Sequence, residues 1–281
     1  APGRAQIPIF VLTLETARDR RAPLLAQLRA LGLDHELFFG VDGTGGLPPE
    51  HEHLVDRSAR ITERRRPMTD GEYACALSHI FIHREIVARG LPEAIILEDD
   101  ALVGAALADM AHRRFAPNGD LVILDHERGC YHWRGPRPVT ARLTAYRVAV
   151  APLLATGYLM RLSAARHFVS EALPIRGAAD WPCDIRRLES VALYPRIVDH
   201  VEKKTDRQSL LRQSRSRLAS AHRANSPRGV RQIIHPHFWR RRLRDLNRLR
   251  YRTLDGRVAL ELSETMTEGV PASCSESVHP G

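Results

Sequence analysis

Residues 69–103 read TDGEYACALSHIFIHREIVARGLPEAIILEDDALV, and this stretch predicts a helix that leads into a buried strand. Thr69 followed by Glu72 fits a capping box, in which each side chain satisfies a backbone N–H of the other residue at the start of a helix. Gly90 and Pro92 are expected to end this helix. Between these limits, apolar side chains recur at helical spacing at Leu77, Ile80, Phe81 and Val87.

The strand predicted over residues 94–97 is followed without a gap by three carboxylates, Glu98, Asp99 and Asp100. Adjacent carboxylates repel, and beside an apolar core they must be hydrated, paired or bound to a cation. Successive residues of an extended chain point to opposite sides, so we expect Glu98 and Asp100 to share a face and Asp99 to point away. The triplet is therefore either a solvated acidic turn or a hard-oxygen site for Mg²⁺ or Mn²⁺.

The chain opens with a β-α-β pattern. Residues 7–14 (IPIFVLTL) predict a buried strand, residues 17–33 carry leucines at helical spacing, and residues 35–43 predict a second strand that ends in a Gly-rich turn. This order predicts an α/β fold with a parallel, doubly wound sheet, which binds ligands outside the carboxyl ends of its strands. The other expected elements are a long loop over 43–67, a strand over 120–125, two strands around Pro152, a helix over 163–173 with Ser163 as N-cap, and a strand over 191–200.

The bulk composition is that of an ordinary soluble protein with an excess of positive charge. The 281 residues are 43% hydrophobic, and the formal net charge of +9 favours anionic partners such as nucleic acid, anionic lipid or phosphorylated ligands. The four cysteines form no CxxC pair, which argues against a zinc knuckle and fits a reducing compartment. We find no apolar run long enough to predict a transmembrane helix and no pattern typical of a signal peptide.

Arginine becomes dense from Lys203 to Arg252, which marks a basic extension over 203–263 that follows a first domain over 1–202. Residues 238–251 place apolar side chains at near-helical spacing among the arginines, so we expect a basic helix. A solvated face, a nucleic-acid patch and a helix lying on an anionic membrane are the three alternatives, of which we rank the membrane first and nucleic acid last. Residues 264–281 are expected to be a disordered tail.

Several segments together resemble glycosyltransferase family 25, the lipooligosaccharide and lipopolysaccharide β-galactosyltransferase family that also includes collagen galactosyltransferases. Residues 69–103 resemble its G-E-x-x-C-x-x-S-H helix followed by I-L-E-D-D, and this block is specific. The opening β-α-β and the run ATGYLMRLSAARHFV support the match, which covers roughly residues 7–200. Thr13 stands where the family usually has Asn, and Gly40 where it usually has Ala, which could alter nucleotide contacts.

The resemblance implies a GT-A-like doubly wound mixed sheet flanked by helices, a UDP-sugar donor, Mn²⁺ (or Mg²⁺) and inversion at the anomeric carbon. Glu98 and Asp100 then correspond to the family's variant of the metal-binding D-x-D motif, with Asp100 as the direct ligand and His200 as a possible third ligand. The donor-binding residues that the resemblance implies are Thr13, Leu14, Arg20, Asp42, Glu72, Ser78, His79 and Asp99. Solvation, helix capping and turn formation remain alternative explanations for Arg20, Glu72 and Asp42 respectively.

An inverting transfer also needs a base that takes the proton of the acceptor hydroxyl. Asp180 and Asp184 flank Trp181, which could stack on a sugar, and we favour Asp184 as the base over Asp180. A surface turn with a capping aspartate is the alternative for this segment.

The function we expect is transfer of a hexose, galactose first, from UDP to a hydroxyl of a lipid-linked saccharide such as lipopolysaccharide core. We expect the protein in the cytoplasm, peripheral on the cytoplasmic face of the inner membrane. A metal-dependent sugar nucleotidyltransferase and a non-catalytic basic module that binds membrane or RNA are the alternatives. We find no Gly-rich basic loop near the N-terminus of the kind that the first alternative needs for a triphosphate. The retained Glu98, Asp100, Ser78 and His79 argue against the second alternative.

Overall fold

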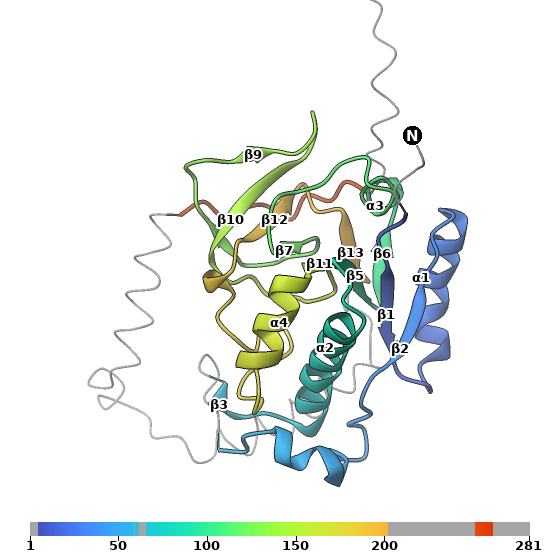
Figure 1. The fold of residues 1–281 in the computed structure, drawn as a ribbon, viewed down its shortest axis with the longest axis vertical. Coiled ribbons are helices and arrows are strands. Elements are labelled where there is room, and N and C mark those ends of the chain that lie inside the picture. The colour runs from blue at the N-terminus through green and yellow to red at the C-terminus, as the bar shows by residue number, and fades with distance from the viewer. Residues whose placement is uncertain (1–4, 59, 62–65, 202–250, 261–281) are drawn as a thin grey trace, which may run out of the picture.

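The structure is a computed structural model that describes residues 5–58, 60–61, 66–201 and 251–260. The fold is mixed α/β, and a nine-stranded mixed sheet forms the centre of the part described (Figure 1). The strand order is β2 (Glu36–Phe39), β1 (Ile9–Thr13), β5 (Glu93–Glu98), β11 (Gly157–Arg161), β7 (Leu121–Ile123), β12 (Ser190–Tyr194), β10 (Thr144–Val150) and β8 (Cys130–Tyr131), with β9 (Arg137–Pro138) also paired to β10.

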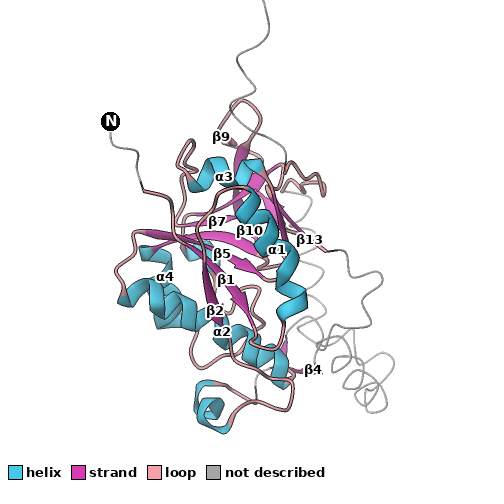
Figure 2. Ribbon diagram, turned by 90° about the vertical axis from the view of Figure 1, so that its right-hand side faces the viewer, coloured by secondary structure: helices cyan, strands magenta, loops and turns pink. Residues whose placement is uncertain are grey.

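Helices cover both faces of the sheet. On one face, α2 (Asp70–Ala88) and α4 (Leu162–Glu171) lie side by side, while α1 (Arg18–Ala30) and α3 (Ala105–Ala111) belong to the opposite face (Figures 1 and 2). The alternation of a strand separates the two cores, because Phe10 and Leu12 pack toward α2 whereas Ile9 and Val11 pack toward α1. The apolar residues of β1 and β5 are therefore buried on both faces of the sheet, as the sequence predicts.

The carboxyl ends of several strands meet at one edge of the sheet. β1 is parallel to both β2 and β5, and its last residues pair Thr13 with Phe39 and Leu12 with Glu98. β7 runs in the same direction as β5, since both are antiparallel to β11 between them, so Asp125 emerges at this edge too. We call this the acidic edge, because Glu98, Asp99, Asp100 and Asp125 all follow strands that end there.

The capping box at the start of α2 is confirmed, with the Thr69 side chain accepting from the Glu72 N–H and Glu72 accepting from the Thr69 N–H. The expected N-cap at Ser163 is wrong, because Arg161 occupies that position and the Ser163 hydroxyl bonds Asp120 instead. Within 43–67, where a loop was expected, the structure has a 3₁₀ helix (Pro49–Leu54) and the short strands β3 (Arg60–Ile61) and β4 (Arg66–Pro67).

The last predicted strand, over 191–200, is two strands rather than one. After β12 the chain turns and forms β13 (Val198–His200), which pairs with β6 (Ala101–Val103) in a separate two-stranded sheet. β6 follows the acidic triplet directly, so this pairing brings the end of the described N-terminal part back to the acidic edge. A second 3₁₀ turn, Ile185–Arg187, precedes β12.

Residues 251–260 lie in the expected basic extension, but they form no helix. Arg252 forms a backbone β-bridge with Tyr131, and Val258 forms one with Arg196, so the segment runs extended against the sheet domain. The prediction of a helical extension over 203–263 is therefore wrong for these ten residues. Residues 203–250, with the basic helix expected over 238–250, and the tail over 264–281 lie outside the described residues. Within the described ranges, no helix is both long and apolar enough to cross a membrane.

Candidate functional site

The three carboxylates of the acidic triplet contact two different partners, His79 and Arg20. Glu98 is the last residue of β5, and its Oε1 lies 3.2 Å from His79 Nε2 on α2. Asp99 and Asp100 form a turn and both contact Arg20, at 2.8 Å and 3.0 Å. The expectation that Glu98 and Asp100 share a face is therefore wrong. Side-chain alternation holds only while the backbone stays extended, and the chain leaves the strand after Glu98.

Asp99 is the most buried member of the triplet, with a relative exposure of 5%. Its Oδ2 accepts a hydrogen bond of 2.9 Å from the Thr13 hydroxyl, and its Oδ1 pairs with Arg20 Nε. Burial raises the pKa of Asp99 to about 6, against the opposing effects of Arg20 and Thr13. The Thr13 hydroxyl thus donates the hydrogen bond that orients this carboxylate.

The loop between β1 and α1 is held in place by arginine. Arg21 donates to the Leu14 carbonyl at 2.8 Å, while the adjacent Arg20 forms ion pairs with the two aspartates. Thr13, Leu14 and Arg20 therefore lie together at the acidic edge, and their contact with a donor stays a prediction. Arg20 is an ion-pair partner in the structure rather than a merely solvated side chain.

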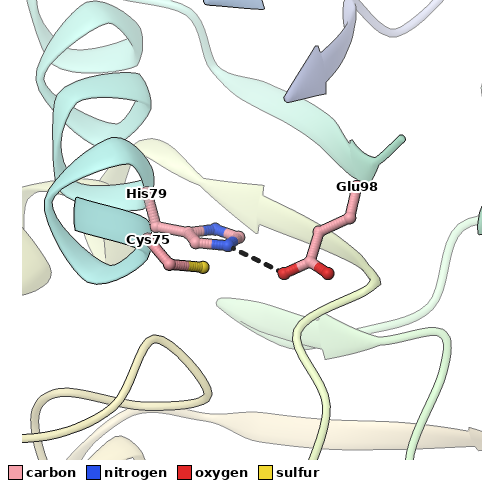
Figure 3. Close-up of side chains that lie close together, drawn as sticks. All are labelled: Cys75, His79 and Glu98. Carbon is pink, nitrogen blue, oxygen red and sulfur yellow. Dashed lines mark hydrogen bonds and ion pairs between the residues drawn. The ribbon is translucent and has the colours of Figure 1, made fainter. Parts of the chain in front are cut away.

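His79 is part of a buried group that the sequence only partly indicates. Its Nδ1 lies 2.9 Å from the Tyr158 hydroxyl, and His83 Nε2 lies 2.9 Å from the same hydroxyl. The side chain of Cys75, one turn before His79 on α2, completes a group with Glu98 whose possible ligand atoms all lie within 4.8 Å of one another (Figure 3). Sequence reasoning missed Tyr158 and His83, because nothing in a strand residue or a helical histidine indicates that they meet.

Ser78 and Glu72 connect α2 to the neighbouring segments. The Ser78 hydroxyl accepts from the Val41 N–H at 2.8 Å and donates to the Ala74 carbonyl at 2.7 Å, so it fastens the end of β2 to the helix. A Cβ added at Gly40 would lie 2.5 Å from Ser78 Oγ, so the loop approaches α2 more closely than an alanine permits without a shift. Ser78 has a structural role at the acidic edge, and Glu72 is a buried cap.

Asp42 follows the same strand and forms a local turn. It is exposed, and its Oδ1 accepts from the Thr44 N–H at 2.9 Å. The turn-forming alternative for Asp42 is therefore the one that the structure shows, and a contact with ribose stays a prediction.

The backbone of His200 pairs next to the acidic triplet, but its imidazole contacts Asp125 instead of the triplet. β13 pairs His200 with Ala101, and the Val201 N–H donates to the Asp100 carbonyl at 3.3 Å. His200 Nδ1 bonds Asp125 Oδ2 at 2.9 Å, and this carboxylate raises the pKa of His200. Asp125 also pairs with the buried Arg196, whose guanidinium donates to the Gly256 carbonyl at 3.1 Å.

The segment with the two candidate bases is anchored by Trp181. The indole N–H donates to the Pro152 carbonyl at 2.9 Å, and the ring meets Tyr158 edge-on at 5.8 Å. Trp181 therefore packs inward, which leaves its ring less free to stack on a sugar. Asp184 is exposed, caps the following 3₁₀ turn and pairs with Arg186 at 2.7 Å, which lowers its pKa. The capping alternative thus describes Asp184.

Two groups of side chains in the described residues could hold a metal ion, and neither is the expected set. One is Cys75, His79 and Glu98, and the other is Asp125, Asp199 and His200. Thus Glu98, Asp100 and His200 are not brought together as one ligand set. Sequence reasoning noted that a strand ends at Asp125 but gave this residue no role, and Asp199 was missed because its neighbours come from a distant strand.

Comparison with known proteins gives a consistent family. Residues 6–184 match the sequence profile described as glycosyltransferase family 25 (LPS biosynthesis protein). A glycosyltransferase 25 family member from Aedes aegypti is 35% identical over 98 residues, which are 33% of this chain and 16% of that protein. Procollagen galactosyltransferase 2 from Homo sapiens is 30% identical over 96 residues, 33% of this chain and 15% of its own length.

Other relatives that match the same share of this chain are named inactive. An inactive glycosyltransferase 25 family member 3 from Mus musculus is 34% identical over 95 residues, or 33% of this chain and 16% of that protein. The alignments with these curated relatives thus span about a sixth of their length.

Proposed function

The chain belongs to glycosyltransferase family 25, and on this premise we propose that it transfers a hexose from a UDP donor to a saccharide hydroxyl. Galactose is the first candidate sugar, because one named relative is a procollagen galactosyltransferase. The family description as an LPS biosynthesis protein favours a lipid-linked glycan such as lipopolysaccharide core as the acceptor. We further propose that the fold is GT-A-like and that the reaction inverts the anomeric carbon.

The observation that carries this proposal is the acidic edge. Open α/β sheets bind ligands outside the carboxyl ends of their strands, and here those ends gather Thr13, Arg20 and the acidic triplet. A nucleotide diphosphate needs cationic groups at its phosphates, and Arg20 supplies one at this edge. The carboxylates beside it are suited to a divalent cation that accompanies the diphosphate.

The side chains at this edge fit a hard divalent cation such as Mn²⁺ or Mg²⁺. Asp99 and Asp100 offer carboxylate oxygens, the ligand type that both ions accept. Burial raises the pKa of Asp99 despite the nearby Arg20, and the neighbouring carboxylates add to this effect, so a further positive charge here would favour the ionised form. We therefore propose that Asp100 with Asp99, rather than with Glu98, holds the ion. When bound, it would neutralise charge on the departing UDP.

The chain's own residues divide the remaining tasks. Arg20 orients the two aspartates, and we propose that it also contacts the diphosphate. Ser78 holds the end of β2 against α2. For the base we now favour Asp180 over Asp184, because Asp184 is committed to Arg186 and its lowered pKa weakens it as a base. Asp180 precedes Trp181, which contacts Tyr158 beside the acidic edge.

Turnover of a panel of UDP-sugars, with Mn²⁺ or with EDTA, tests the proposal. We expect transfer or slow donor hydrolysis with UDP-galactose, inhibition by EDTA and recovery with Mn²⁺. Asp100→Ala should abolish activity, whereas the matched change Asp34→Ala should not, because the exposed Asp34 precedes β2 at the opposite edge of the sheet. Full activity in EDTA refutes the metal. Absence of turnover with every donor would place the chain with its inactive relatives.

The base is tested separately by single-turnover kinetics. Asp180→Asn should lower the rate of transfer by about 10²-fold, the usual scale for general-base catalysis, with UDP affinity unchanged. Asp184→Asn is the comparison variant and should retain most activity. If the two results are exchanged, Asp184 is the base as the sequence alone suggested.

A lipid-linked acceptor would bring the protein to a membrane surface. We propose that the protein is peripheral on the cytoplasmic face of the inner membrane, with the arginine-dense residues 238–251 as the contact. This proposal rests on the sequence pattern, since nearly all of that segment lies outside the described residues.

A further inference from the structure

We propose that His79 is a positioning residue that holds Glu98 through a one-way hydrogen-bond chain, His83 to Tyr158 to His79 to Glu98, with the proton of each imidazole on Nε2. Its effect on transfer rests on the proposed function, because Glu98 is the first carboxylate of the acidic triplet.

The chain is formed by three distances. His83 Nε2 lies 2.9 Å from the Tyr158 hydroxyl, which lies 2.9 Å from His79 Nδ1, and His79 Nε2 lies 3.2 Å from Glu98 Oε1. All but Glu98 are almost wholly buried, so water does not compete for these groups. Burial lowers the pKa of His83 well below its usual value and raises that of Tyr158, so His83 is neutral and Tyr158 keeps its proton.

The direction of the chain is decided first at His83. A neutral imidazole carries its proton on one nitrogen, and His83 Nδ1 is buried without a hydrogen-bond partner. A proton on Nδ1 would leave a buried N–H without an acceptor, whereas a proton on Nε2 leaves only a bare lone pair. The Nε2 proton therefore points at the Tyr158 oxygen, and Tyr158 must donate its own proton to His79 Nδ1.

The Glu98 end gives the same direction independently. An ionised carboxylate only accepts hydrogen bonds, so His79 Nε2 must carry the proton that faces Glu98 Oε1. With its proton on Nε2, His79 offers a bare Nδ1 to Tyr158, as the other end of the chain requires. A doubly protonated His79 would reverse the Tyr158 bond and leave His83 with the orphan N–H described above.

This direction also decides between a hydrogen-bond chain and a metal site. Cys75, His79 and Glu98 could form a thiolate, imidazole and carboxylate ligand set of the kind that suits Zn²⁺ (Figure 3). A metal on His79 would require a bare Nε2 and a proton on Nδ1, which reverses every bond back to His83. The buried Nδ1 of His83 therefore favours the hydrogen-bond chain.

The consequence is a fixed carboxylate at the start of the acidic triplet. Glu98 accepts from His79 on α2, while Asp99 and Asp100 form the ion pairs with Arg20. His79 thereby acts on the donor site through Glu98, whereas the family resemblance implied that His79 itself binds the donor.

The test is the tautomer of each histidine, read from ¹⁵N NMR shifts of the full chain in EDTA. We expect both His79 and His83 to be protonated on Nε2. A proton on Nδ1 of either residue overturns the chain. If stoichiometric Zn²⁺ moves the proton of His79 to Nδ1, the metal site replaces the hydrogen-bond chain and the proposal is overturned.

Two tyrosine variants complete the test. Tyr158→Phe removes the hydroxyl and should give His79 a mixture of tautomers, with a loss of transfer rate of about tenfold. Tyr131→Phe is the matched control, because its hydroxyl is equally buried and has no hydrogen-bond partner. A Tyr158→Phe variant with altered tautomers and normal transfer overturns the positioning role. If the wild-type protein has no transferase activity, the proposed function is overturned. The histidine tautomers still decide whether the hydrogen-bond chain exists.

Discussion

The substitution Asp99→Asn should stabilise the protein at neutral pH. Burial holds the pKa of Asp99 at about 6, against an ordinary value of 3.8, so the ionised carboxylate is disfavoured in the folded state. A difference of about two units corresponds to roughly 3 kcal/mol. The asparagine avoids this penalty and remains satisfied, because the Thr13 hydroxyl can accept from the amide while donating to the Leu14 carbonyl, 3.3 Å away.

The effect of Asp99 on the free energy of unfolding depends on pH, because its pKa differs between the folded and unfolded states. Asp99 has a raised pKa in the folded state, so its stabilising contribution is complete below the unfolded value of 3.8 and is lost as pH rises through 6. About half of this loss of stability, roughly 1.5 kcal/mol, occurs between pH 5 and pH 8. The advantage of the variant over the wild type should therefore grow by that amount between these two pH values and level off above pH 7.

The assay is urea unfolding followed by tryptophan fluorescence, at pH 5 and pH 8 in EDTA. Asp184→Asn is the matched control of opposite sign, because Arg186 lowers the pKa of Asp184. That carboxylate contributes stability above its unfolded pKa and loses it as pH falls, so its asparagine variant should be slightly less stable at pH 8. The reasoning is refuted if Asp99→Asn is less stable than the wild type at pH 8, or if its advantage does not change with pH.

Three further outcomes are expected. Ser78→Ala removes the acceptor of the part-buried Val41 N–H and should cost about 0.5–1.5 kcal/mol in urea unfolding, whereas Ser170→Ala, at an exposed hydroxyl, should cost little. Arg20→Gln removes the nearest positive charge from Asp99 and should raise the carboxylate pKa measured by ¹³C NMR; an unchanged value contradicts the ion pair. Replacing the arginines within 238–250 by glutamine should abolish co-sedimentation with anionic vesicles, which added salt should also weaken; equal binding to neutral vesicles would exclude the electrostatic contact.

The membrane test uses substitutions rather than a shortened chain for a structural reason. Residues 251–260 form backbone β-bridges with Tyr131 and with Arg196, and the Gly256 carbonyl accepts a hydrogen bond from the Arg196 side chain. A chain that ends before this segment would lose contacts of the sheet domain together with the basic residues. Substitution changes the charge alone.

The local features of the fold could be predicted from the sequence, because their causes lie within a few residues. The capping box of α2, the apolar centres of strands β1 and β5, and the acidic triplet at the end of β5 all follow from residue type and spacing. The order β-α-β likewise predicted the parallel neighbours at the start of the sheet. The family resemblance rested on the same local pattern and is confirmed over residues 6–184.

Only the tertiary structure decided what each acidic side chain contacts. Sequence alternation paired Glu98 with Asp100, but the turn after β5 sends Asp99 and Asp100 to Arg20, which comes from the helix after β1. Tyr158 reaches His79 because an antiparallel strand, β11, is inserted between β5 and β7, and no sequence pattern announces that insertion. Spacing fixes which side of its own element a residue occupies. Its partner depends on which distant element packs there, and that is set by the burial of the whole sheet.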